Sequence, residues 1–172
     1  MKKILLCILV SASLIACTNQ ETKTEAKTET TGSVTTTGPD VDLIKKSITA
    51  FADGDWATYA STYADTAKSY HNIWPSNTDT TVGVKIPVLI EGFKKQRELM
   101  DGKLTMGGTI FEVVTMPDGS KYGHVWVDFT WKNKKGEVGK SVLFDSYGIN
   151  KDGKISYEWP IYDTKDVVRL GN

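Results

Sequence analysis

The stretch 121–163 constrains the fold most strongly, because it has the pattern of three consecutive antiparallel strands. Each predicted strand is rich in β-branched and aromatic residues that alternate with polar ones. Turn-forming residues at 133–136 and 151–153 separate the strands. The rest of the folded domain must therefore cover the face that these strands bury.

Composition and charge narrow the class of protein. The chain has 172 residues, 40% of them hydrophobic, and its 21 basic side chains balance 21 acidic ones. This length suits one modest domain with additional segments. Because the chain lacks the basic excess of nucleic-acid-binding proteins, we expect no nucleic acid as a partner.

The N-terminus resembles a bacterial lipoprotein signal. Two lysines precede an apolar run at 4–15 that is too short to span a bilayer. Residues 14–17 resemble a lipobox, whose final cysteine, here Cys17, is acylated. The resemblance implies a signal peptide at 1–16 and a membrane anchor in the bacterial cell envelope; a secretory signal with a chance cysteine is the alternative. Thr18 stands where enterobacterial lipoproteins kept at the inner membrane have aspartate, which favours the outer membrane, on its periplasmic or surface side.

Residues 17–39 have the composition of a disordered tether. Threonine, glutamate and lysine dominate, and Val34 is the single aliphatic residue between Thr30 and Pro39. Such a segment buries too little apolar surface to offset the entropy of ordering. We therefore expect the folded domain to occupy 40–172.

Helical periodicity marks the start of this domain. We expect a first helix from Asp40, as N-cap, to Gly54, and a second helix capped by Asp55. The predicted inward face of the first helix consists of Val41, Ile44, Ile48 and Phe51. A short strand at 67–73 follows.

A third helix is predicted from Pro87 to Gly102. Its predicted inward residues are Leu89, Ile90, Phe93, Leu99 and Met100. A strand at 104–116, with a bulge at its two glycines, then leads into the three strands of the opening stretch. The order helix, helix, strand, helix and four strands predicts an α+β fold, with helices segregated from a curved antiparallel sheet.

The strand at 122–131 presents two alternating faces. One contains Val125, Val127, Phe129 and Trp131, and the other contains His124, Trp126, Asp128 and Thr130. Core packing favours burial of the first set, which places His124 and Asp128 outside. In the opposite register, His124, Trp126 and Asp128 would line a cavity.

The domain resembles the nuclear transport factor 2-like superfamily, which includes SnoaL-like cyclases and ketosteroid isomerases. The matching motifs lie at 51–56, 63–65, 152–155 and 158–159, with Asp163 at the end. The resemblance implies a cone-like barrel, in which a strongly curved antiparallel sheet wraps around a long helix and N-terminal helices cover one face. It also implies a pocket open at one end and a homodimer formed through the sheet.

The resemblance to ketosteroid isomerases implies two catalytic candidates. Asp145 matches the position of an acid that donates to the substrate oxyanion, and His71 that of the catalytic base. Two differences from the family patterns count against an isomerase or a cyclase activity. Ser47 replaces an oxyanion tyrosine, and Pro160 follows Trp159 where the cyclases have an aspartate.

An aromatic pocket for a small apolar ligand is the related expectation. Its predicted residues are Tyr59, Tyr63, Trp74, Tyr147 and Glu158. Alternative interpretations remain open: His71 as a pocket or rim residue without catalytic duty, Asp145 paired with a neighbouring lysine or hydroxyl, and aromatic residues that only fill the core.

No metal or cofactor is expected. The chain has two histidines and no cysteine after Cys17, and it lacks phosphate-loop and hydrolase motifs. Three functions compete: a lipid-anchored module that binds a small apolar or aromatic ligand, a cofactor-independent acid-base enzyme of isomerase, cyclase or dehydratase type, and an interaction subunit that uses its sheet face.

Overall fold

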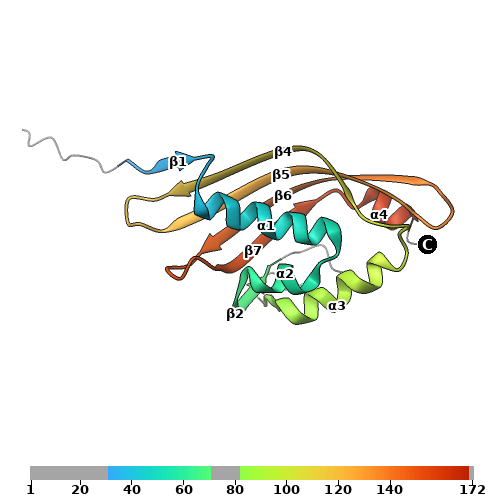
Figure 1. Ribbon diagram of the computed structural model, residues 1–172, viewed down its shortest axis with the longest axis horizontal. Helices are drawn as coiled ribbons and strands as arrows, with labels where there is room; N and C mark the ends of the chain where they lie inside the picture. Colours follow the sequence, from blue (N-terminus) through green and yellow to red (C-terminus); the bar gives the residue numbers. More distant parts are fainter. Residues whose placement is uncertain (1–30, 71–81, 171–172) are drawn as a thin grey trace, which may run out of the picture. The chain divides into compact units, whose positions relative to one another are not determined.

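Seven strands form one mixed sheet in the computed structural model, which describes residues 31–70 and 82–170. Within these residues the strands are β1 (Ser33–Thr35), β2 (Tyr63–Ser69), β3 (Val84–Lys85), β4 (Thr105–Thr115), β5 (Lys121–Lys132), β6 (Val138–Ile149) and β7 (Ile155–Tyr162). The helices are α1 (Pro39–Asp53), α2 (Trp56–Ser61), α3 (Ile86–Arg97) and α4 (Lys165–Leu170). The spatial order is β1-β4-β5-β6-β7-β2-β3, and the curved sheet does not close on itself (Figure 1).

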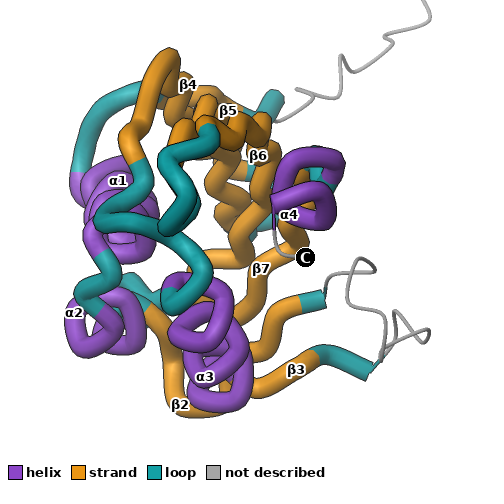
Figure 2. The backbone as a smooth tube through the Cα atoms, turned by 90° about the vertical axis from the view of Figure 1, so that its right-hand side faces the viewer, coloured by secondary structure: helices purple, strands orange, loops and turns teal. Residues whose placement is uncertain are grey.

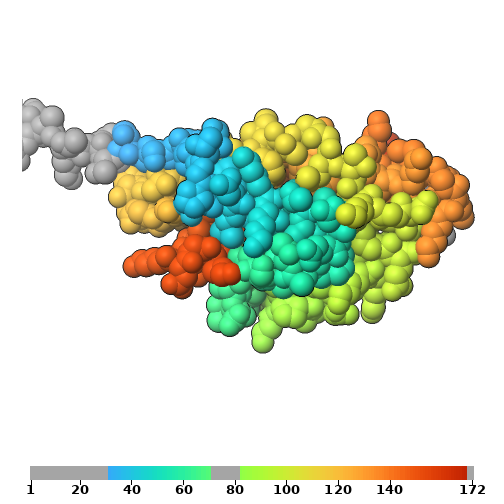
Figure 3. Space-filling model, in the orientation of Figure 1, coloured from blue at the N-terminus to red at the C-terminus, as the bar shows by residue number. Residues whose placement is uncertain are grey.

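The helices α1, α2 and α3 lie on one side of this sheet (Figure 2). α1 contacts β4 and β5, whereas α3 contacts β2 and β3. Their side chains form a continuous layer over the sheet (Figure 3). The α+β cone predicted from the sequence is therefore confirmed, but the described strands form an open cone rather than a barrel.

The antiparallel meander of β4 to β7 has the predicted position and turns. Gly119, Gly136 and Gly153 each have positive φ, between 66° and 84°, where residues with a side chain would be strained. The register between β4 and β5 shifts between Met106 and Thr109, which confirms the bulge predicted at the two glycines. The opening stretch of sequence therefore forms the centre of the sheet.

The register of β5 follows the core-packing expectation. Val125, Val127, Phe129 and Trp131 are all buried. On the opposite face, Trp126 and Asp128 are exposed and His124 is half-buried. His124 therefore belongs to the outer face, where its Nδ1 lies 3.3 Å from Glu112 Oε1.

Ordered structure begins earlier than residue 40. β1 pairs with the end of β4, so part of the segment predicted as a tether belongs to the sheet. α1 begins at Pro39, preceded by Gly38 as N-cap, and Asp40 lies in its first turn. The composition of 31–39 did not reveal β1, because a strand of three exposed residues is held by pairing and not by burial.

α1 and α2 meet at a tight corner, as predicted. Gly54, with φ 73°, ends α1, and Asp55 caps α2 by accepting a hydrogen bond from Thr58 N–H at 3.0 Å. The expected inward residues Val41, Ile44 and Ile48 are at most 2% exposed. This packing fixes α1 across the inner face of the sheet.

β2 corrects the prediction of a purely antiparallel sheet. It starts at Tyr63, directly after α2, and pairs in parallel with β7. A register shift between Tyr63 and Lys68 breaks the two-residue alternation, which is why the pattern predicted a later start. Residues 71–73 of the predicted strand lie outside the described part of the chain.

α3 ends before its predicted stop. Arg97 donates to the backbone carbonyls of Phe51 and Ala52 at the end of α1, which ties α3 to that helix. Leu99, expected inside, lies beyond α3 and is 49% exposed. β1, β3 and α4 were not predicted, because each is too short for a periodic signal.

Two regions lie under α1. The packed end, defined as Val41, Ile44, Val113, Val125, Ile149 and Ile155, is filled by aliphatic side chains that are at most 9% exposed. Gly123 makes room there, since a Cβ at this position would collide with Ile44 Cδ1. Beyond Ile48 the space under α1 opens into a cavity.

Candidate functional site

A cavity of about 80 Å³ lies between the three N-terminal helices, the strands β5 to β7 and α4. This volume holds several water molecules or a small organic molecule. Its aromatic wall consists of Phe51, Tyr59, Phe93, Phe129, Trp131, Tyr147 and Tyr162. Aromatic and aliphatic side chains thus provide most of the surface that a ligand would contact.

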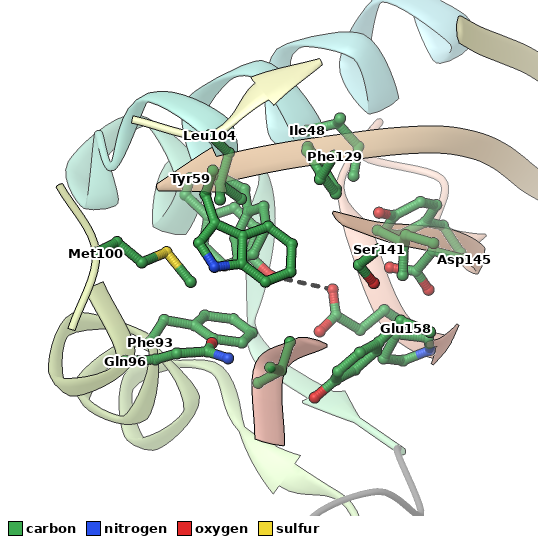
Figure 4. Close-up of a pocket in the computed structure, with 17 residues that line it drawn as sticks. Ile48, Tyr59, Phe93, Gln96, Met100, Leu104, Phe129, Ser141, Asp145 and Glu158 are labelled. Atoms are coloured by element: carbon green, nitrogen blue, oxygen red, sulfur yellow. Dashed lines mark hydrogen bonds between the residues drawn. The ribbon is translucent and has the colours of Figure 1, made fainter. Parts of the chain in front are cut away.

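The wall differs between its inner and outer parts. Asp145, Tyr147 and Glu158 are at most 3% exposed and define the inner part. Gln96 and Met100 are among the half-exposed residues of the outer part. Figure 4 shows Gln96 and Met100 on one side of the cavity and the two carboxyl groups on the other.

Glu158 reaches the cavity from β7 and is fixed by hydroxyl groups. Its Oε2 accepts hydrogen bonds from Tyr59 Oη, at 3.1 Å, and from Tyr63 Oη. The two tyrosine oxygens are 2.9 Å apart. Burial raises the pKa of Glu158, and hydrogen bonds from Tyr63, Ser69 and Tyr59 oppose this increase by stabilising the carboxylate.

Asp145 reaches the cavity from β6, and only one of its two carboxyl oxygens is hydrogen-bonded to described residues. Burial, followed by the charge of Glu158, raises the pKa of Asp145 well above its ordinary value, and hydrogen bonds from Tyr147 and from the backbone of Ser146 and Trp159 only partly oppose this. Its Oδ1 is buried and has no hydrogen-bond partner among the described residues. Asp145 therefore favours its neutral form and keeps one oxygen available to a ligand.

The three buried tyrosines near the two carboxyl groups remain protonated. Burial and the nearby carboxyl charges raise the pKa of Tyr59, Tyr63 and Tyr147 well above the ordinary value. They therefore act as hydroxyl donors at neutral pH, and not as bases. Chemically, the inner wall is a pair of carboxyl groups with different environments, held by phenols.

The structure brings most of the predicted site residues together. The cavity is lined by the predicted residues Tyr59, Asp145, Tyr147 and Glu158. Tyr63 does not line it, but its hydroxyl group donates a hydrogen bond to Glu158. Predicted candidates His71 and Trp74 lie outside the described residues. Ser47, which replaces the isomerase tyrosine, is buried on α1, and its Oγ has no hydrogen-bond partner among the described residues.

Sequence reasoning missed other parts of the wall. The missed residues include Phe93, Gln96, Met100, Leu104, Ser141 and Val167. Phe93 was predicted only as a core residue, and the short α4, which contributes Val167, was not predicted. The alternation of β6 was a usable signal for Ser141, because it lies on the same face as Asp145.

Within 31–70 and 82–170, no group of three or more His, Cys, Asp and Glu side chains could hold a metal ion. None of the helices in those ranges is long and apolar enough to cross a membrane.

The architecture defines a class of protein: an α+β cone whose curved sheet and covering helices enclose a pocket. This is the nuclear transport factor 2-like fold. A nuclear transport factor 2-like protein from Burkholderia xenovorans superimposes with a TM-score of 0.54, at 16% identity over 78% of this chain and 96% of that chain.

Two further solved structures share the fold. A ketosteroid isomerase-like protein from Erwinia carotovora has a TM-score of 0.52, at 17% identity over 69% of this chain and 89% of that one. The BvnE pinacolase from Penicillium brevicompactum has a TM-score of 0.60, at 9% identity over 77% and 88%. No family model and no curated protein matches the sequence. At these identities the similarities establish the fold alone.

Proposed function

We propose that this domain binds a small, largely apolar molecule whose polar group contacts Asp145 in the cavity. The observation that carries the proposal is the buried, unpartnered Oδ1 of Asp145 in the wall of an aromatic cavity. Native proteins rarely leave a buried oxygen without a partner unless the site has a use for it. A bound ligand would supply that partner.

The proposal includes attachment to a membrane of the cell envelope through Cys17. Its support is the sequence alone: the apolar run at 4–15 and the lipobox-like residues at 14–17. An outer-membrane location remains the favoured expectation. In this arrangement the domain would receive its ligand outside the cytoplasm.

A catalytic function is the second candidate. Its specific support is the difference between the two carboxyl groups. A neutral Asp145 could donate to a carbonyl oxygen, whereas hydrogen bonds from Tyr59 and Tyr63 favour the carboxylate form of Glu158. His71 remains the predicted base. This candidate requires turnover of a carbonyl compound, which separates it from simple binding.

The outer face of the sheet supports the expected homodimer. Ile110, Trp126, Phe144 and Ile161 lie opposite one another on successive strands β4 to β7. Ile110 and Ile161 are more than half exposed, and Trp126 is 39% exposed. A contiguous apolar row of this kind is typical of a protein interface. We propose that a second copy of the chain covers this row.

The first experiment tests ligand binding. The protein is purified from its native host beside Asp145→Asn, and the organic extracts are compared by mass spectrometry. Asp128→Asn is the matched control, since Asp128 is exposed on the opposite face of the sheet. We expect a defined molecule with the wild type and the control, and its loss from folded Asp145→Asn. Equal recovery from all three proteins would contradict the role of Asp145, and no molecule from any of them would count against a tightly bound ligand.

A further inference from the structure

The described wall of the cavity contains acidic side chains and no basic ones. Its ionisable residues other than tyrosine are Asp145 and Glu158, and none of the described lining residues is Lys, Arg or His. The ion pairs formed within the described ranges include neither carboxyl group. The described part of the wall therefore presents acidic groups without a basic counterpart.

Arg97 is close to the aromatic wall but already has its own partners. Its guanidinium donates to the carbonyls of Phe51 and Ala52 at the end of α1. It also lies 5.3 Å from the ring centre of Phe51 and 5.8 Å from that of Trp56. Its positive charge thus stabilises the end of a helix and an aromatic pair, and does not neutralise Asp145 or Glu158.

Asp145 and Glu158 line the same cavity as a cluster of aromatic side chains. Phe51 contacts Phe93 edge to face, with centroids 4.9 Å apart, and Phe129 at 5.8 Å. The ring centroid of Tyr59 lies 6.0 Å from that of Phe51, and the Tyr59 hydroxyl group donates a hydrogen bond to Glu158. Aromatic faces attract cations, and aromatic rings also accommodate an apolar body.

The hydrogen-bonding requirement points to the same ligand chemistry. Oε2 of Glu158 accepts from two tyrosines, whereas Oδ1 of Asp145 is buried and accepts from no described group. An ammonium group offers donors and no acceptor, and it brings a positive charge that none of the described lining residues supplies. A carboxylate ligand would add a third acidic group to the same small space.

From these observations we propose that the ligand is a protonated organic amine, with its ammonium group against Asp145 and Glu158 and its apolar body against Phe51 and Phe93. This inference rests on the proposed binding function and narrows its ligand class. A bound ammonium group would favour the ionised form of Asp145, which is neutral in its absence. An ammonium group held between the two carboxyl groups and the aromatic rings is desolvated, so its interactions are stronger than they would be at the surface.

A charge series of matched probes tests the inference. Phenethylamine, 2-phenylethanol and phenylacetate have similar size and carry a positive, neutral and negative polar group at pH 7. Binding of each to the purified protein is measured by titration calorimetry. We expect phenethylamine to bind at least about tenfold more tightly than 2-phenylethanol, and phenylacetate to bind most weakly.

Substitutions in the cavity test whether the preference for the amine arises from binding there. Asp145→Asn and Glu158→Gln should each reduce the preference for phenethylamine over 2-phenylethanol, with 2-phenylethanol binding little changed. Asp128→Asn should leave both affinities unchanged. Circular dichroism establishes that each variant is folded, and Glu158→Gln remains informative if Asp145→Asn does not fold.

Three results would overturn the inference. Equal or tighter binding of 2-phenylethanol would show that the cavity does not select a cation, while the proposed binding of apolar molecules would stand. A preference for phenethylamine that survives both cavity substitutions would place the amine elsewhere. Absence of binding by every probe would also reject it, and the extraction experiment would then decide the broader proposal separately.

Discussion

The two regions under α1 differ in how completely side chains fill the space between the helix and the sheet. At the packed end, Ile44 fits into the space left by Gly123, and its neighbours leave it 0% exposed. One turn further along the same helix, Ile48 is also buried but faces the cavity. The same helix and strands therefore build a filled core at one end and a hollow one at the other.

The difference shows that the cavity is not a consequence of small side chains. Phe129, Trp131 and Tyr147 are larger than the aliphatic residues of the packed end. They surround the space instead of filling it, and polar groups that prefer partners are placed among them. The hollow end thus gives up packing that the chain achieves elsewhere, as a binding site requires.

Replacing Ile44 or Ile48 by alanine should give the largest effects on stability. Comparing the two losses measures the difference between the packed end and the cavity end. We expect Ile44→Ala to lower the free energy of unfolding by about 3–5 kcal/mol, because it leaves a new void in a filled region. Ile48→Ala should lower it by only about 2 kcal/mol, since Ile48 lines the cavity and its truncation enlarges a space that is already empty. Urea unfolding measures both values, and equal losses would contradict the distinction between the two ends.

Removal of the Glu158 side chain should have the next largest effect. Glu158→Ala deprives the hydroxyl groups of Tyr59 and Tyr63 of their acceptor, and we expect a loss of about 1–3 kcal/mol. Glu158→Gln keeps an acceptor oxygen in place and should lose less. Thermal unfolding of the two variants at one pH provides the comparison, and an alanine variant as stable as the wild type would show that the network does not stabilise the fold.

Asp145 gives a pH-dependent prediction with a defined sign. Because burial raises the pKa of Asp145, the folded state binds this proton more tightly than the unfolded state, and the contribution of Asp145 to stability falls as pH rises. The side chain of Asp145→Asn does not titrate, so the stability of this variant relative to the wild type should increase as the pH is raised from about pH 4, the ordinary pKa of an aspartate, towards neutral pH. Unfolding curves measured across that range test the sign, and a constant difference would indicate a normal carboxyl group.

The outer face of the sheet should affect stability least, because it belongs to neither region under α1. Trp126→Lys should change the stability of the monomer by less than about 0.5 kcal/mol, since Trp126 is an exposed residue. It should nevertheless shift a dimer to a monomer in sedimentation analysis if the apolar row is the interface. A wild-type protein that is monomeric at all concentrations would refute the proposed homodimer.

The sequence predicted those parts of the fold that have strong local signals. The alternation of Val125, Val127 and Phe129 indicated the buried face of β5, and Gly54 with Asp55 indicated the corner between α1 and α2. These signals come from residues close together in the chain. The parallel pairing of β2 with β7 could not be predicted in this way, because it joins segments far apart in the sequence.

The candidate site was predictable in its residues more than in its geometry. Asp145 and Glu158 were identified by resemblance and by strand alternation, and both lie in the cavity wall. The unpartnered Oδ1 and the lack of a basic residue in the described wall are properties of the assembled structure. Both depend on side chains from α1, α2, α3 and three strands, and no local pattern specifies that combination.

The hydrogen bonds of Glu158 also have a consequence for the order of folding. This residue is separated from Tyr59 by 99 positions and from Tyr63 by 95, and its strand is inserted between β6 and β2. Contacts between such distant segments form late and slow the folding of a domain, typically to milliseconds or longer. The chain must therefore be synthesised through β7, and this strand docked between β6 and β2, before the pocket exists at all.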